Sequence, residues 1–306
     1  MANWRITTAT NSMTPELTRL KALVESALDD ALPRHSDIAQ AVTDAMRHAV
    51  LGGGKRMRPL LACAACRAVG GDGEDALPTA CALEFIHAYS LIHDDLPAMD
   101  DDELRHGLPS AHIAFGEANA ILAGDSLHSL AFQALVTAPA ISAATKVRMI
   151  ELLARAAGWS GMAGGQCLDI AAEGKMLTLD QLKALHAAKT GALICAAVEL
   201  GALSSTAAPV NETQLQHLSQ FGKKIGLAFQ VIDDVLDVTQ SSDKLGKPAG
   251  SDEALNKNTF PRLIGLDAAR ALAHDLVDEA VAELRRGEVH SDDLEALARV
   301  VVERDH

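Results

Sequence analysis

The stretch from His93 to Glu103 constrains the fold most, because it places six acidic side chains within ten residues directly after the apolar run from Cys81 to Ile92. The apolar run predicts a buried helix, and the acidic stretch stands at its end. Such a cluster repels itself unless a positive group sits within it. A solvated acidic turn is the simpler explanation, but it does not account for a second acidic group further along the chain.

Paired aspartates recur between Phe229 and Asp237, again within an apolar helical pattern. Asp233 and Asp237 are four residues apart, so they lie one turn apart on one helix face. Two acidic segments of this kind predict two walls of one metal cavity.

Pro97 shapes the first of these walls. It disfavours helical backbone at the residue before it, so Asp94 and Asp100 cannot belong to one unbroken helix. We therefore expect a bulged or wound-out turn that returns Asp100 toward Asp94. Carboxylates in this arrangement suit a hard cation such as Mg²⁺, which takes one or two of them together with phosphate oxygens and water.

The composition predicts a nearly all-α protein, since only 3% of the 306 residues are aromatic whereas Ala and Leu dominate. We find no domain linker and expect a tail over 1–14 and one domain over 15–306. The pattern predicts helices from Pro15 and over 38–50, 60–70, 76–95, 110–136, 141–172, 179–204, 212–240, 253–264, 267–286 and 291–303.

The formal charge of −14 disfavours nucleic acid and anionic membranes as partners, because both need a basic surface. The polar start and the lack of a long apolar run predict a soluble, cytoplasmic protein. The five cysteines lie in helical, Ala/Leu-rich contexts and are expected to be buried thiols. Cys63 and Cys66 have the spacing of one pair of ligands in a zinc site, but no second pair follows, so we interpret them as packing residues.

A glycine-rich turn from Leu51 to Pro59 carries three cations. It is not a phosphate-binding loop of the Walker type, because Lys55 is followed by Arg56 rather than Ser or Thr. Glycines let the backbone approach a ligand closely, and Lys55 and Arg58 suit a phosphate or diphosphate. A surface turn with incidental cations is the alternative. Further cations are Arg105, Lys189 and Lys247, and together with the aspartates they describe a site for a metal-bound diphosphate.

Taken together, the motifs make the chain resemble the short-chain trans-prenyl diphosphate synthases, and most closely the bacterial farnesyl diphosphate synthases. The motifs that carry the resemblance are Gly53–Pro59, Glu84–Asp101, Gly165-Gln166-x-x-Asp169, Lys189-Thr190-Gly191 and Phe229-Gln230-x-x-Asp233-Asp234-x-x-Asp237, in the family's order. The residues between Asp95 and Asp100, which include Pro97, indicate the bacterial subtype.

The resemblance implies an all-α isoprenoid-synthase fold with a deep apolar pocket between two aspartate-rich helices, usually in a homodimer. It implies condensation of isopentenyl diphosphate with dimethylallyl and geranyl diphosphates by ionisation, condensation and proton elimination. It implies three Mg²⁺ ions, with Mn²⁺ as an alternative, on Asp94, Asp95, Asp100, Asp233 and Asp237.

The resemblance also implies roles for the cations and their neighbours. The allylic diphosphate would contact Arg105, Lys189 and Lys247, with Thr190 and Gln230 beside the reacting carbons and the Phe229 ring near the carbocation. Isopentenyl diphosphate would contact Lys55, Arg58 and His87.

Product length follows from the position of Tyr89 on the predicted helix. Five residues before Asp94, at ~1.5 Å per residue, it lies roughly 7 to 8 Å below the metals. Its ring, with Ser90 beside it, is expected to end the pocket near the farnesyl length. A purely structural Tyr89 is compatible with this role.

His106 departs from the family pattern, which has a second arginine after Arg105. If His106 contacts isopentenyl diphosphate, its charge is weaker and depends on pH. At the end of the chain, Arg304 matches the basic tail of relatives only loosely.

Four alternatives stay open at this point. A geranyl or geranylgeranyl diphosphate synthase differs only in product length. A class I terpene cyclase has no isopentenyl diphosphate site, so Lys55, Arg58 and His87 argue against it. The Glu84-x-x-His87 spacing is found in di-iron bundles, but no second copy of it occurs. A non-catalytic helical metal-binding protein leaves the cationic turn unexplained.

Overall fold

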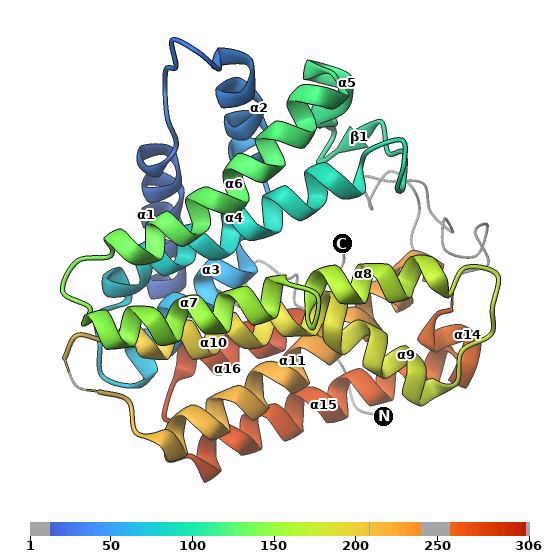
Figure 1. Cartoon of the computed structure of the whole chain (residues 1–306). Coiled ribbons are helices and arrows are strands. Elements are labelled where there is room, and N and C mark those ends of the chain that lie inside the picture. Colours follow the sequence, from blue (N-terminus) through green and yellow to red (C-terminus); the bar gives the residue numbers. More distant parts are fainter. Residues whose placement is uncertain (1–12, 208, 240–257, 304–306) are drawn as a thin grey trace.

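The computed structural model describes residues 13–207, 209–239 and 258–303, and almost all of their regular secondary structure is helical (Figure 1). The helices are α1 (Pro15–Ala31), α2 (Gln40–Leu51), α3 (Met57–Ala68), η2 (Gly73–Ala76), α4 (Leu77–Asp94), α5 (Ala111–Phe115), α6 (Glu117–Thr137), α7 (Ala143–Ala157), α8 (Met162–Ala171), α9 (Leu179–His186), η3 (Ala187–Gly191), α10 (Ala192–Leu203), α11 (Glu212–Thr239), α14 (Phe260–Ile264), α15 (Leu266–Arg286) and α16 (Asp292–Glu303). The strands β1 (Leu104–Arg105) and β2 (Leu108–Pro109) form one short antiparallel hairpin. The all-α prediction is confirmed.

The helices begin where capping side chains allow them to begin. The Thr14 side chain accepts from the Leu17 N–H at the start of α1, and Pro15 occupies the first turn, where its missing N–H costs nothing. At α9, Thr178 and Gln181 form a reciprocal capping box. These local signals explain why predicted and observed helix starts agree closely in this part of the chain.

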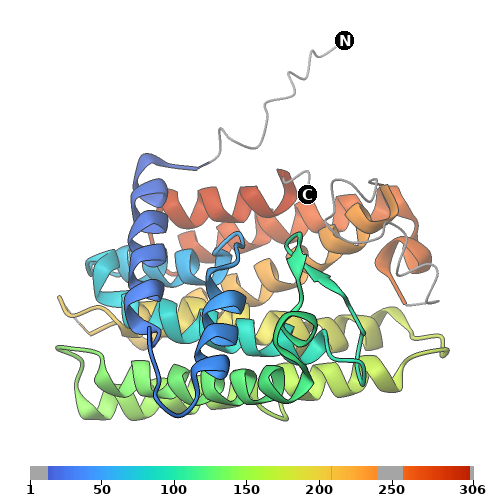
Figure 2. The ribbon, with the colours of Figure 1, turned by 90° about the horizontal axis from the view of Figure 1, so that it is seen from above.

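The centre of the molecule is formed by α3, α4, α10 and α11. Helix α4 packs between α3 and α6, while α10 packs against both α3 and α11, and α11 also packs along α15. Seen from above, α1 crosses the direction of most of the other helices (Figure 2). Buried residues cover most of α4 and α10, as expected for helices enclosed by others.

Two predicted helices are broken in the structure. The expected helix over 110–136 is divided at Gly116, whose φ of 84° is incompatible with a right-handed helix. The expected helix over 141–172 is divided between Ala157 and Met162. The expected helix over 179–204 runs on, but a π-helical turn, η3, is inserted into it. The first part of the expected helix over 253–264 lies outside the described residues.

Four of the five cysteines are buried, as predicted, and burial raises the pKa of Cys63 and Cys66 to about 12. Cys167 was expected to be buried and is exposed, because α8 buries only Met162 and Gly165. None of the described helices is long and apolar enough to cross a membrane.

Candidate active site

The turn after α4 brings the predicted acidic groups together. Asp95 caps the helix, and the chain then folds back so that the Asp100 N–H donates to the Asp94 carbonyl at 2.9 Å. The Asp101 N–H donates to the Leu96 carbonyl at 3.2 Å, with Asp101 in left-handed conformation at φ 52°. The expected bulged turn around Pro97 is therefore present, and it places Asp100 next to Asp94 in the backbone.

A cavity of about 580 Å³ opens beside this turn. Its wall combines the end of α4, α8 and η3, and it includes the predicted residues Arg58, His87, Tyr89, Ser90, Asp94, Lys189 and Thr190. Apolar side chains such as Leu91, Met162 and Ile170 line the rest. A cavity lined by both apolar and charged side chains suits a ligand with an apolar chain and an anionic end.

Asp94 is the carboxylate at this cavity that most needs a cation. Burial raises its pKa to about 6, and Asp100 and Asp95 act in the same direction, while Lys189 and Arg105 oppose the shift. The ionised form of Asp94 is thus disfavoured when no cation is bound, and a bound divalent cation would favour it. This donor set fits Mg²⁺.

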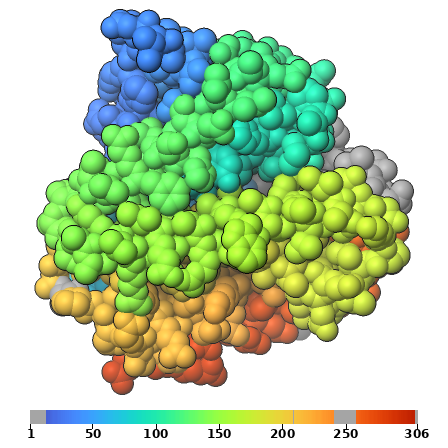
Figure 3. Space-filling view, viewed as in Figure 1, coloured from blue at the N-terminus to red at the C-terminus, as the bar shows by residue number. Residues whose placement is uncertain are grey.

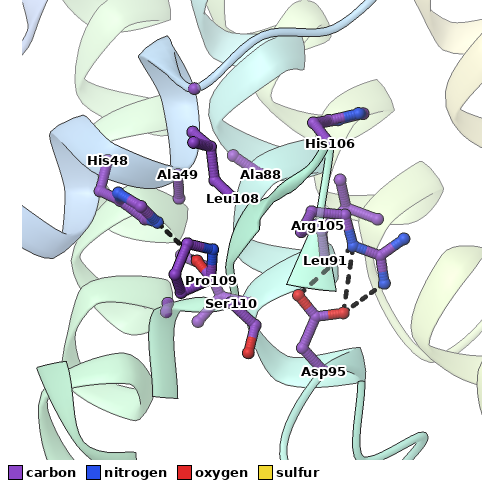
Figure 4. Close-up of a pocket in the computed structure, with 13 residues that line it drawn as sticks. His48, Ala49, Ala88, Leu91, Asp95, Arg105, His106, Leu108, Pro109 and Ser110 are labelled. Atoms are coloured by element: carbon purple, nitrogen blue, oxygen red, sulfur yellow. Dashed lines mark hydrogen bonds and ion pairs between the residues drawn. The ribbon is translucent and has the colours of Figure 1, made fainter. Parts of the chain in front are cut away.

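Asp95 and Arg105 form a pair of their own at the side of the site. The Arg105 guanidinium, carried by β1, binds the Asp95 carboxylate through Nε at 3.1 Å and also through Nη2 (Figure 4). Its Nη2 also lies 3.3 Å from the Asp102 carboxylate. The Asp95 side chain is buried. Arg105 therefore neutralises Asp95 here, and their roles toward metal and diphosphate stay predictions.

The glycine-rich turn separates its three cations. Arg56 is buried in left-handed conformation, with φ 55°, and donates to Glu84 at 2.5 Å, to Glu25 at 2.9 Å and to the Val50 carbonyl at 2.7 Å. It is a structural clamp that sequence reasoning missed, because its partners lie far away in the chain. The binding of Glu84 by Arg56 also disfavours the di-iron alternative.

Arg58 faces the cavity and has a different environment. Its Nε is buried and has no hydrogen-bond partner among the described residues. Burial lowers the pKa of Arg58, although Glu84 and Asp233 act in the opposite direction. An anion would satisfy this guanidinium. The interaction with Asp233 also brings the second acidic segment into the neighbourhood of the cavity. Lys55 is exposed.

The π-helical turn η3 presents Lys189 and Thr190 side by side. Lys189 binds Asp169 on α8 at 2.6 Å, and the Thr190 hydroxyl donates to Gln230 on α11 at 3.0 Å. Gly165 is required here, because a Cβ on it would lie 2.2 Å from the backbone nitrogen of Lys189. A π-helical turn of this kind is frequent at functional sites.

The second acidic segment is tied to this turn through α11. The Gln230 amide donates to Asp234 at 3.1 Å, and Asp234 also accepts from the Phe260 N–H at 2.9 Å. Asp233 is half-buried, as is Phe229, while Asp237 is buried. Within the described ranges, no three His, Cys, Asp or Glu side chains are grouped to hold a metal ion by themselves. Lys247 and Arg304 lie outside the described residues.

Tyr89 stands in the cavity wall within a row of aromatic rings. Its ring meets His93 edge-on at 5.7 Å and His128 on α6 at 5.1 Å, and His128 in turn lies 5.3 Å from Phe132. The rings of His128 and Phe132 were not predicted, since nothing in the sequence relates α6 to Tyr89. Ser90 is turned to its own helix, where its hydroxyl donates to the His87 carbonyl at 2.8 Å.

The surroundings of His87 and His106 both favour the neutral imidazole. Burial lowers the pKa of His87 well below its usual value, with Arg58 acting in the same direction. Burial, followed by the charges of Arg105, Arg56 and Lys55, lowers the pKa of His106. The structure therefore brings His106 near the cationic turn, as its predicted role requires.

Comparison with known proteins defines the family. The family model described as polyprenyl synthetase matches residues 39–298, and the chain belongs to this family. The chain is 50% identical to the farnesyl diphosphate synthase of Escherichia coli, over 86% of this chain and 89% of the relative. It is 43% identical to that of Geobacillus stearothermophilus, over 95% of this chain and 97% of the relative.

Two further matches bear on product and ligands. The geranylgeranyl diphosphate synthase of Cyanophora paradoxa is 43% identical, over 94% of each chain. Among solved structures, the Helicobacter pylori geranyltransferase complexed with magnesium and isoprenyl diphosphate has a TM-score of 0.82 and 34% identity, over 94% of this chain and 96% of that chain. The likeness thus extends over nearly the whole chain in both sequence and fold.

Proposed function

We propose that the chain is a farnesyl diphosphate synthase, which condenses isopentenyl diphosphate first with dimethylallyl diphosphate and then with geranyl diphosphate. The observation that carries the proposal is one cavity lined by Asp94, Arg58, Lys189 and Thr190 together with apolar side chains and the ring of Tyr89. Identity of 43 to 50% to farnesyl diphosphate synthases over most of the chain supports it.

Mg²⁺ is the proposed cofactor. Asp94 and Asp100 would hold it from the first acidic segment and Asp233 and Asp237 from the second, with Asp95 as a further candidate. We propose three ions when a diphosphate is bound, and a relative crystallised with magnesium and isoprenyl diphosphate supports this choice of metal. Bound Mg²⁺ would stabilise the charge that develops on the departing diphosphate.

The side chains of this chain divide the two substrates between them. Lys189 and Arg105 hold the allylic diphosphate, to which Lys247 is also assigned, and Arg58, His87, His106 and Lys55 hold isopentenyl diphosphate. The buried Nε of Arg58, which has no hydrogen-bond partner among the described residues, supports its assignment to isopentenyl diphosphate.

The reaction breaks the allylic C–O bond, and the electron pair leaves with the diphosphate. The isopentenyl double bond then attacks the allylic carbocation, and the departed diphosphate takes the proton that is lost. Thr190 and Gln230, which are hydrogen-bonded to each other, orient oxygen atoms beside the reacting carbons. Phe229 shields the cation with its ring face.

Tyr89, with Ser90 beside it, is proposed to set the product at fifteen carbons. Geranylgeranyl diphosphate synthase is the second candidate, since such enzymes are 43% identical to the chain, but the aromatic row at Tyr89 favours the shorter product.

A homodimer is proposed as the working form, with α6 and α7 at the interface. Three large apolar side chains of α6 are exposed, namely Ile121 (42%), Leu122 (51%) and Val136 (53%). Together, α6 and α7 cover the middle of one face of the molecule (Figure 3). Exposed apolar side chains on this helix support its proposed part in association. We place the enzyme in the cytoplasm, with no nucleic-acid partner.

Product analysis tests the proposal. The purified protein is incubated with Mg²⁺, dimethylallyl diphosphate and labelled isopentenyl diphosphate, and the dephosphorylated products are sized. We expect farnesol as the main alcohol. Geranylgeraniol would establish the second candidate, and the absence of any condensation product would refute both.

A further inference from the structure

The hairpin of β1 and β2 is too small to hold its own position. It has two residues in each strand, paired Leu104 to Pro109 and Arg105 to Leu108, and Pro109 has no N–H to donate to its partner. The turn residues His106 and Gly107 both have positive φ, 53° and 77°, which is the pattern of a type I′ turn. A two-stranded hairpin alone is marginal in water, so contacts with the rest of the molecule must fix it.

Those contacts come from two sides. Arg105 ties the first strand to Asp95 at the end of α4. On the opposite side, Nε2 of His48 on α2 lies 2.8 Å from the Pro109 carbonyl of the second strand (Figure 4). Because a carbonyl can only accept, Nε2 must carry the donated proton. The His48 ring is itself oriented edge-on against Phe115 of α5, with centroids 5.3 Å apart.

His48 also stands where α2 joins the glycine-rich turn. Its carbonyl accepts from the Gly52 N–H at 3.1 Å. A Cβ on Gly52 would lie 3.3 Å from the Leu108 side chain, and one on Gly53 would lie 3.8 Å from Cβ of His106. The end of α2 therefore contacts both the turn that carries Lys55 and the hairpin that carries His106.

We propose that His48 is a positioning residue, which fixes the distance between the hairpin and the glycine-rich turn and thereby completes the isopentenyl diphosphate subsite. The inference rests on the proposed function for the identity of the substrate. The diphosphate group of isopentenyl diphosphate does not take part in bond making or breaking, so contacts to that group are about equal in the ground and transition states. A loosened hairpin should therefore raise KM for isopentenyl diphosphate and leave kcat almost unchanged.

Three variants separate the hydrogen bond from the ring. His48→Phe keeps an aromatic ring against Phe115 and removes the donor, whereas His48→Gln restores an N–H donor without the ring. His274→Phe, at an exposed position on α15, is the matched control. Each is compared for steady-state kinetics, melting temperature and amide hydrogen exchange over 103–110.

For His48→Phe we expect KM for isopentenyl diphosphate to rise about fivefold, the effect of losing about one net hydrogen bond, with kcat within twofold and faster exchange in the hairpin. His48→Gln should restore KM to within twofold, and the control should match the parent. Unchanged KM and exchange in a folded His48→Phe protein would overturn the inference, as would a KM increase that His48→Gln fails to reverse. If the parent forms no product, the proposed function fails, while hydrogen exchange in the hairpin still tests whether His48 holds the hairpin in position.

Discussion

Replacing Tyr89 by alanine should lengthen the product from fifteen to twenty carbons. The next ring on the same face of α4 is Phe85, four residues earlier and therefore about 6 Å further along the helix axis, a length on the order of one isoprenyl unit. Phe85 is fully buried and borders a separate cavity of about 440 Å³ between α1, α4 and α6. The Tyr89→Ala pocket should thus gain room for one more unit before it meets Phe85.

The assay is chromatography of the dephosphorylated products made from labelled isopentenyl diphosphate. We expect geranylgeraniol to replace farnesol as the main alcohol. Because Tyr89 is half-buried, the substitution should cost less than the about 3–5 kcal/mol that truncation of a buried aromatic costs, so the fold should persist. Tyr89→Phe, which keeps the ring, is the control and should still yield farnesol. A folded Tyr89→Ala enzyme that makes only farnesol would refute the assignment of Tyr89.

Three further predictions concern charge. His106→Arg should lower KM for isopentenyl diphosphate at pH 8 with little change in kcat. Burial lowers the pKa of His106, which favours the neutral imidazole at pH 8, so arginine adds a permanent charge. Steady-state kinetics tests this, and an unchanged KM would mean that residue 106 does not touch the substrate. Asp94→Asn should stabilise the metal-free protein at pH 8 by about 1–3 kcal/mol in denaturant unfolding, because the pKa of Asp94 in the folded protein, about 6, exceeds its unfolded value and ionisation therefore opposes folding. This stabilisation should decrease as the pH drops from 6 to 4 and vanish below pH 4. A variant that is less stable than the parent at pH 8 would contradict the prediction. Arg56→Met should destabilise the fold by about 3 kcal/mol or more, because Glu84 is left buried without the cation that binds it. Glu25→Gln, at the more exposed partner of Arg56, should cost about 1 kcal/mol or less. Equal melting temperatures for the two variants would refute the role of Arg56 as a structural clamp.

The parts of the structure that the sequence predicts are those set by residues close together in the chain. The caps at Thr14 and Thr178 act within one turn, and the effect of Pro97 on its neighbour reaches only a few residues, so helix starts and the return of Asp100 could be inferred. The partnership of Arg56 with Glu25 and Glu84 joins segments about 30 residues apart, and no short-range pattern announces it.

The hairpin of β1 and β2 has a signal in the sequence, in the residues of its turn. His106-Gly107 between Leu104 and Leu108 is a two-residue connection ending in glycine, which favours a type I′ turn. The π-helical turn at Ala187–Gly191 has no such signal, because it depends on the close approach of Gly165 to Lys189. The row from Tyr89 to His128 likewise arises only when α4 and α6 pack together.

The central claim is that two acidic segments, distant in sequence, act on one metal-bound diphosphate. Calorimetric titration of inorganic diphosphate, with and without Mg²⁺, tests it on the parent protein and on Asp94→Asn and Asp233→Asn. We predict that the parent binds diphosphate tightly only when Mg²⁺ is present, and that each substitution alone weakens this binding at least tenfold. Parent-like, Mg²⁺-dependent binding in a folded Asp233→Asn protein would contradict the claim.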